Sequence, residues 1–172
     1  ADHAIACLKL HQDEHPQKPF FQYLAFYSPH FPLHALQEDI NSYSHAYDKG
    51  WDVIRQQRLE RMKKMGIVDC KLSKRQPNVK PGWNLSQDKL TKLIGPGEAG
   101  KAIAWEELTD EQKTFQAKKM EIHAAMISRM DAEIGRVIDQ LKKMNEFENT
   151  LIMFMSDNGA SAEQFIRGDM HD

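Results

Sequence analysis

The chain has 172 residues, of which 41% are hydrophobic and 28% are charged, and its formal net charge is -2. This length is enough for one hydrophobic core, or for the middle of a larger one. Nucleic-acid-binding modules usually carry a strongly basic face, so the near-neutral charge argues against such a module. No apolar stretch approaches the roughly 20 residues that a membrane-spanning helix needs. The two cysteines, Cys7 and Cys70, provide no disulfide framework.

A strand followed by a histidine loop is predicted after an N-terminal helix over residues 2–11. Residues 19–27 are apolar and aromatic, and they end abruptly in a polar segment that contains His30. Pro29 and Pro32 flank His30, and each proline fixes its own φ and keeps the preceding residue out of the helical region. We therefore expect His30 to lie in a stiff, extended loop, and not on the face of a helix.

The middle of the chain is predicted to be helical, with a loop-rich insert. Residues 52–65 have the pattern of an amphipathic helix that packs on a sheet, and prolines and glycines mark a loop-rich stretch over residues 69–105. Thr109 and Gln112 have the spacing of a capping box. They open a helix that runs to about Met144, and its apolar stripe favours a crossover helix packed on a sheet over a coiled-coil arm. The stripe consists of Phe115, Met120, Ala124, Ile127, Met130, Ile134, Val137, Ile138 and Leu141.

A second apolar run of strand length, residues 150–155, leads into Ser156-Asp157-Asn158-Gly159. Such a run, bounded by polar residues, is typical of a strand covered on both faces in a parallel sheet. Ligands of open sheets bind beyond the carboxyl ends of the strands. Asp157 and Asn158 offer oxygen donors of the kind that hold Ca²⁺ or Mg²⁺. Taken alone, the same residues fit a simple turn better.

Together the two predicted strands define a candidate site. About 120 residues of mostly helical pattern separate them, so the connection is a crossover that can leave the strands parallel. We predict an α/β fold, with a mostly parallel sheet flanked by helices and a loop-rich insertion. His30 and Asp157 should lie near the same edge of that sheet. His34 could line the same pocket by proximity, although a solvent-facing loop histidine fits equally well.

At these residues the chain resembles the sulfatases, the formylglycine-dependent sulfuric ester hydrolases of the alkaline phosphatase superfamily. Residues 19–35 resemble the family segment PFF-x-YLAF-x-x-PH-x-P. Met130-Asp131-x-x-Ile134-Gly135 and Ser156-Asp157-Asn158-Gly159-Ala160 resemble its long helix and its metal loop. The stretch over residues 47–66 is similar to that of bacterial arylsulfatase-type members. The resemblance extends over about residues 1–159 and implies an alkaline-phosphatase-like fold.

The resemblance also implies roles for individual residues. Asp157 and Asn158 would be ligands of the catalytic cation, which is Ca²⁺ with Mg²⁺ as an alternative. His30 would be a catalytic residue that meets the sulfate ester near its leaving oxygen. His34 is a substrate-binding candidate by its proximity to His30 and not by the resemblance. The substrate would be a small-molecule or glycan sulfate ester, with no nucleic-acid partner and no membrane span. The family further implies a periplasmic or secreted enzyme of bacterial origin, and the oligomeric state stays open.

Part of the family's machinery is not found in this sequence. The formylglycine forms from Cys or Ser in a Cys/Ser-x-Pro-x-Arg motif, and neither Cys7 nor Cys70 stands in one. Two further metal-binding aspartates and a downstream lysine of the family are also not found. We therefore expect an internal piece of a sulfatase catalytic domain that is inactive alone. Its parts are a helix, strand and histidine loop (1–48), a helical and loop-rich insertion (49–108), and a long helix, strand and metal loop (109–172).

Two alternatives remain beside the sulfatase hypothesis. A phosphoesterase of the same superfamily would bind transition metals through more histidines than the single well-placed His30 offers. A non-catalytic interaction protein would use the apolar stripe of the predicted helix over residues 109–144 to bind a partner, because an exposed stripe of that length drives association.

Overall fold

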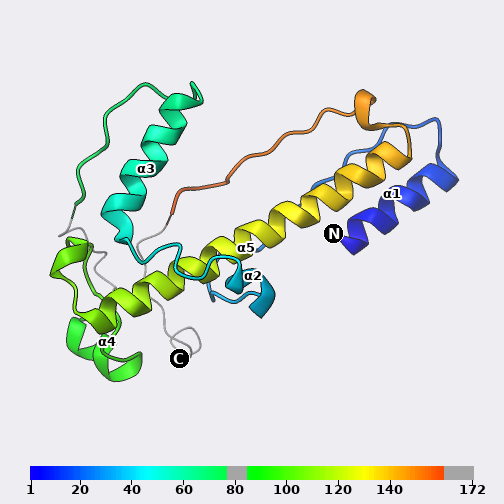
Figure 1. The fold of residues 1–172 in the computed structure, drawn as a ribbon. Coiled ribbons are helices and arrows are strands. Elements are labelled where there is room, and N and C mark those ends of the chain that lie inside the picture. Colours follow the sequence, from blue (N-terminus) through cyan, green and yellow to red (C-terminus); the bar gives the residue numbers. More distant parts are fainter. Residues whose placement is uncertain (77–84, 161–172) are drawn as a thin grey trace. The chain divides into compact units, whose positions relative to one another are not determined.

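A computed structural model describes residues 1–76 and 85–160 of the chain (Figure 1). Parts of the predicted insertion and of the predicted metal-loop segment fall on residues 77–84 and 161–172, outside the described residues. No helix in the described part is long and apolar enough to cross a membrane. The helices are α1 (Asp2–Glu14), α2 (Gln37–Asn41), α3 (Gly50–Lys64), α4 (Gln87–Leu93), η1 (Trp105–Glu107), α5 (Asp110–Lys143) and η2 (Phe147–Asn149).

The chain divides into two compact units. The first unit comprises Ala1–Ser42 and Ile122–Asp157, and the second comprises, of the described residues, 43–76, 85–121 and 158–160. The long helix α5 therefore contributes its first three turns to the second unit and the rest to the first.

The beginning of α5 confirms the predicted capping box. The Gln112 amide N–H donates to Thr109 Oγ1 at 3.2 Å, and the Thr109 N–H donates to Gln112 Oε1 at 3.1 Å. These two bonds satisfy backbone donors that have no partner within the first turn of a helix. The predicted helix over residues 109–144 is thus confirmed almost residue for residue.

In the second unit, the buried Trp105 of η1 holds the start of α3. Gly50 has φ +79°, and a Cβ at this position would lie 2.2 Å from the indole ring of Trp105, so only glycine fits there. Trp51 Nε1 donates to the carbonyl of Ile103 at 3.0 Å. The predicted helix over residues 52–65 is α3, which begins two residues earlier and ends one residue earlier.

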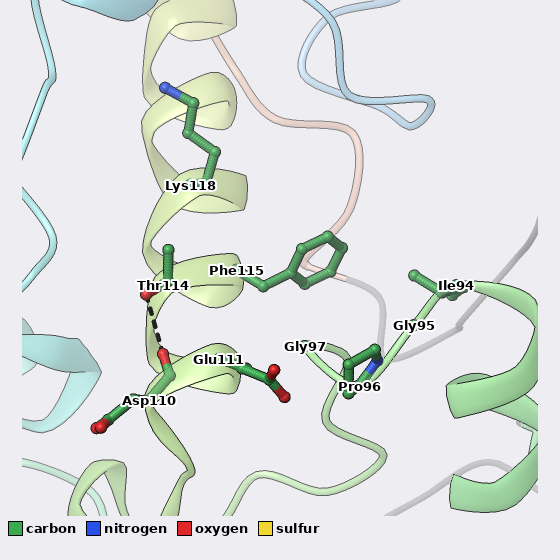
Figure 2. Close-up of a pocket in the computed structure, with 9 residues that line it drawn as sticks. All are labelled: Ile94, Gly95, Pro96, Gly97, Asp110, Glu111, Thr114, Phe115 and Lys118. Atoms are coloured by element: carbon green, nitrogen blue, oxygen red, sulfur yellow. Dashed lines mark hydrogen bonds between the residues drawn. The ribbon is translucent and has the colours of Figure 1, made fainter.

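A cavity of about 610 Å³ opens in the second unit between the loop after α4 and the first turns of α5 (Figure 2). The Phe115 ring and Pro96 face each other across it (Figure 2). Asp110 and Glu111 lie at its margin, in the first turn of α5, where the helix dipole favours negative charge. None of the predicted site residues lines this cavity.

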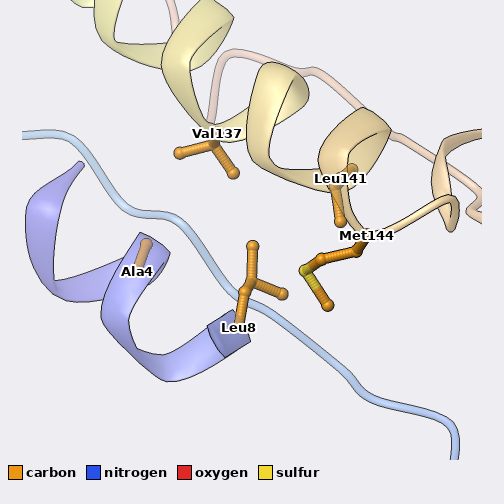
Figure 3. Close-up of a cluster of buried hydrophobic side chains, with 5 residues drawn as sticks. All are labelled: Ala4, Leu8, Val137, Leu141 and Met144. Atoms are coloured by element: carbon orange, nitrogen blue, oxygen red, sulfur yellow. The ribbon is translucent and has the colours of Figure 1, made fainter. Parts of the chain in front are cut away.

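In the first unit, α1 packs against the C-terminal part of α5 (Figure 3). The two helices run in the same direction (Figure 1), with Arg136 of α5 paired to Asp2 at the start of α1. Phe20 and Leu24 pack against the buried cluster between the helices. The cluster consists of Ala4, Leu8, Val137, Leu141 and Met144.

Burial alternates along the first extended segment. From Phe20 to Ser28 the even-numbered residues are half-buried and the odd-numbered ones are exposed. Successive side chains of a strand point to opposite faces. The segment therefore has the side-chain pattern of a strand with one covered face.

The predicted sheet is not confirmed, because no β-strand occurs in residues 1–76 and 85–160. The predicted strands 19–27 and 151–155 are extended segments without regular secondary structure (Figure 1). Residues 19–26 and 151–155 form no backbone–backbone hydrogen bond with any described residue. A strand is stable only beside lateral partners that take up its N–H and C=O groups, and these two segments are not paired with each other.

The apolar stripes of the helices are only partly buried. Ala124, Val137 and Leu141 of the predicted α5 stripe are buried, but Met120 and Ile127 are 41% and 40% exposed. In α3, Val53 is 43% exposed, so the expectation that this helix packs on a sheet is not confirmed either.

Candidate functional site

A tight turn after the first extended segment carries His30. The backbone N–H of His30 donates to the carbonyl of Tyr27 at 3.0 Å, and the Tyr27 hydroxyl donates to the carbonyl of Phe31 at 2.7 Å. The expectation of an extended loop is therefore wrong, because local hydrogen bonds close the chain into a turn. The expectation that His30 does not lie on a helix face is confirmed.

The imidazole of His30 is held in one orientation. Its Nδ1 lies 2.8 Å from the carbonyl oxygen of Phe31. A carbonyl oxygen only accepts hydrogen bonds, so Nδ1 carries the proton of this bond. The rings of Tyr27 and Phe31 flank the imidazole, with centroid distances of 5.0 and 4.8 Å. Nε2 has no partner in the described part of the chain, and it is the atom that can exchange a proton with a substrate.

His34 is held in a similar local way. Its Nδ1 lies 2.8 Å from the carbonyl oxygen of Pro32, and the residue is exposed. In both histidines of the loop, Nδ1 is hydrogen-bonded to a backbone carbonyl oxygen, and Nε2 forms no such bond within the described residues. A substrate-binding role for His34 stays a prediction.

The turn is also attached to α5. The Ser28 hydroxyl donates to the carbonyl of Met126 at 3.2 Å. Met126 is buried, so this bond ties the residue two positions before His30 to a covered part of the helix. The carbonyl of Met126 belongs to a helix interior, and the serine adds a second donor to its oxygen.

Asp157 and Asn158 lie at the end of the second extended segment, in a bend of the chain. Every residue from Leu151 to Ala160 is exposed. The two side chains supply hard oxygen donors, which fit Ca²⁺ or Mg²⁺ chemically, but two ligands are far fewer than the six to eight of a Ca²⁺ site. No group of three or more His, Cys, Asp and Glu residues that could hold a metal occurs in the described ranges. These residues therefore fit a cation only as part of a larger ligand set.

No hydrogen bond or ion pair joins His30 to Asp157 among the residues that the structure describes. Their placement at one edge of a sheet stays a prediction.

Comparison with known proteins identifies the class to which this chain belongs. The family model described as Sulfatase matches residues 1–171. The chain is 41% identical over 141 residues to an uncharacterised sulfatase of Schizosaccharomyces pombe, across 82% of the chain and 22% of that relative. It is 36% identical over 148 residues to an arylsulfatase of Klebsiella aerogenes, across 86% of the chain and 27% of that relative.

These matches define a class of hydrolases that act on sulfate esters and share an alkaline-phosphatase-like α/β fold. The chain belongs to the sulfatase family. It spans about a quarter of the length of the curated relatives it matches, between 22% and 27%.

Proposed function

We propose that the whole protein is a sulfuric ester hydrolase of the arylsulfatase type, and that these residues are an internal part of its catalytic domain. Family membership over residues 1–171 supports the reaction class. The observation that carries the proposal is the arrangement of His30, whose Nδ1 is engaged by the Phe31 carbonyl at 2.8 Å while Nε2 has no partner among the described residues. This arrangement suits a residue that moves a proton at Nε2.

In the proposed reaction His30 donates a proton from Nε2 to the leaving oxygen of the ester. With Nδ1–H held by the Phe31 carbonyl, Nε2 is the nitrogen that would carry the transferred proton, because both ring nitrogens of an imidazolium are donors. An imidazole titrates near neutrality and is suited to general acid work at that pH. His34, four residues further on, would line the pocket that receives the small-molecule or glycan part of the ester.

Asp157 and Asn158 would supply two of the oxygen ligands of a divalent cation, Ca²⁺ with Mg²⁺ as an alternative. When bound, such a cation polarises sulfate oxygens and stabilises the charge that develops on them. The formylglycine nucleophile of the family would come from outside these residues, since Cys7 and Cys70 stand in no Cys/Ser-x-Pro-x-Arg motif. We expect the 172-residue chain alone to hydrolyse no aryl sulfate, and the whole enzyme to be periplasmic or secreted.

The stripe of α5 offers little support for a non-catalytic adaptor. Val137 and Leu141 are already buried against α1 (Figure 3), so this part of the stripe has no free surface for a partner. The phosphoesterase alternative would bind transition metals through several histidines, so the identity of the metal in the full-length protein would distinguish it from the proposed sulfatase.

The proposal is tested by replacing His30 with Ala in the full-length protein and measuring kcat/KM on an alkyl sulfate and on a nitrophenyl sulfate. General acid help is worth about 10²- to 10⁴-fold and matters less as the leaving alcohol becomes more acidic. The loss should therefore be large on the alkyl ester and small on the nitrophenyl ester. His3→Ala, at an exposed histidine of α1, is the control and should change neither. Equal losses on both esters would remove the general-acid role of His30.

A further inference from the structure

We propose that Arg129 of α5 is a positioning residue for His30, acting through the loop that carries it. This loop, residues 28–39, is called the His30 loop below. The inference rests on the proposed function of His30 as a proton donor, because a proton donor must be held within hydrogen-bond reach of the leaving oxygen.

The far end of the His30 loop is tied to α5 by a forked ion pair. Arg129 Nε donates to Asp39 Oδ2 at 2.8 Å, and Arg129 Nη2 donates to Asp39 Oδ1 at 2.8 Å. Nη2 also donates to Glu38 Oε1 at 2.9 Å. Two parallel bonds between a guanidinium and a carboxylate fix direction as well as distance. Asp39 is therefore held in one orientation on the helix.

The near end of the His30 loop is tied to the same face of the same helix. Ser28 donates to the carbonyl of Met126, and Met126 precedes Arg129 by three residues. Residues three apart on a helix are neighbours on its surface, and they are separated by about 4.5 Å along the axis at 1.5 Å per residue. Both ends of the loop are thus fastened within one turn of α5. Compact loops whose ends lie this close are a recurrent way to present functional residues.

The ion pair is suited to positioning rather than to stability. The Arg129 and Asp39 side chains are 41% and 18% exposed, and ion pairs this accessible contribute little to stability because water screens them. The neighbouring Ile40 is buried and provides a separate apolar anchor for α2. Loss of Arg129 should therefore leave α2 attached while it frees the orientation of the loop end.

The same helix offers a matched control. Arg136, two turns beyond Arg129, pairs with Asp2 and Glu133 and has no contact with the His30 loop among these pairs. Removing Arg136 deletes an arginine of the same kind from the same helix without touching the loop.

The test uses the full-length protein and measures kcat/KM on an alkyl sulfate and a nitrophenyl sulfate. A misplacement of about 1 Å costs on the order of 10²-fold, so Arg129→Gln should lose about 10- to 10²-fold on the alkyl ester and little on the nitrophenyl ester. Arg129→Lys should recover part of this loss, because a lysine keeps the charge but not the fork. The double variant Arg129→Asp/Asp39→Arg exchanges the two charges of the pair. It should keep a higher kcat/KM on the alkyl ester than Arg129→Asp or Asp39→Arg alone. Arg136→Gln should leave both rates unchanged.

The decisive comparison is made in the His30→Ala background. If Arg129 acts by positioning His30, adding Arg129→Gln to the His30→Ala variant should not lower kcat/KM any further, because the histidine that Arg129 positions is no longer present. The same loss with and without His30, or a loss equal to that of Arg136→Gln, overturns the inference. If His30→Ala loses equally on both esters, the general-acid role fails, whereas the coupling between the two substitutions still decides whether Arg129 positions His30. Should Arg129→Gln not fold, the exchanged pair decides the question: recovery supports positioning and no recovery contradicts it.

Discussion

Two segments of this protein share one sequence design and have different surroundings in the structure. Residues 19–27 and 150–155 are both apolar runs of strand length that lead into a polar loop. The first lies along helices α1 and α5, with Phe20 and Leu24 packed on their buried cluster and its loop closed by hydrogen bonds. The second has Phe154 and Met155 exposed by 76% and 70%.

The difference shows that a covering helix surface decides which side chains of an apolar run are buried, even where the backbone is not paired. The first run finds a helix surface for one of its faces, so its side chains alternate in burial although its backbone is not paired. The second run finds no cover for either face in the described residues. Its composition is typical of a strand covered on both faces, and the place of residues 151–155 in a sheet stays a prediction.

The largest expected effect concerns the loop after the second segment. In the full-length protein, Asp157→Ala should remove a charged ligand, so bound Ca²⁺ and activity should fall together. A cation supplies several kcal/mol to the transition state, and each 1.36 kcal/mol is tenfold, so the loss should be about 10²-fold or more. Excess Ca²⁺ should restore part of it. Metal analysis alongside kcat/KM is the measurement.

Asp139→Ala is the control for this change, because Asp139 is an exposed carboxylate of α5 whose ion pair is with the neighbouring Lys142. Full metal content in an inactive Asp157→Ala protein would show that Asp157 acts in some way other than as a ligand.

An effect of intermediate size is expected on the unfolding free energy when one apolar side chain of each segment is replaced by alanine. In the 172-residue chain, Leu24→Ala should lower the free energy of unfolding by about 1–3 kcal/mol, since this half-buried side chain packs on the α1–α5 cluster. Phe154→Ala should change it by less than about 0.5 kcal/mol, because an exposed side chain loses little. In the full-length protein, Phe154→Ala should cost about 3–5 kcal/mol if the segment becomes a buried strand.

Urea unfolding of these three variants and of their two parent proteins provides these values. A cost for Phe154→Ala that is as large as that for Leu24→Ala in the short chain would contradict the different surroundings of the two segments.

The smallest expected effect is a pH dependence of the unfolding free energy, caused by a histidine on α5, the helix that supports the first segment. Burial lowers the pKa of His123 on α5 below its reference value of 6.5. The folded state therefore favours the neutral imidazole, and the unfolded state binds the proton more readily. The contribution to stability is present above pH 6.5 and is lost as the pH falls through the lowered pKa of the folded state. The unfolding free energy of His123→Gln should therefore decrease less on acidification than that of the unchanged protein. An equal decrease in both proteins would show that other groups cause the pH dependence.

Local sequence patterns predicted the helices well. Thr109 and Gln112 predicted the start of α5 because a capping box is formed by residues three apart, and Gly66 marked the end of α3 with φ +70°. The short helix α2 was not predicted, since five residues carry too little periodicity.

Features that depend on distant residues could not be predicted in this way. The bond from Ser28 to Met126 spans 98 positions, and that from Arg129 to Asp39 spans 90. No local spacing encodes them. Local patterns cannot predict the sheet for the same reason, because a run such as residues 151–155 becomes a strand only when neighbouring strands pair with it. Sequence motifs therefore indicated His30, Asp157 and Asn158 as candidates, while the groups that hold His30 in place required the structure.

A crystal structure of the full-length protein with Ca²⁺ and sulfate tests the central claim most directly. We predict that residues 20–26 and 151–155 are parallel strands of one sheet, and that His30 Nε2 and the Asp157 carboxylate lie at the same edge, around one sulfate and its cation. A structure in which either segment is helical, or in which His30 and Asp157 lie at opposite edges of the sheet, would contradict the account.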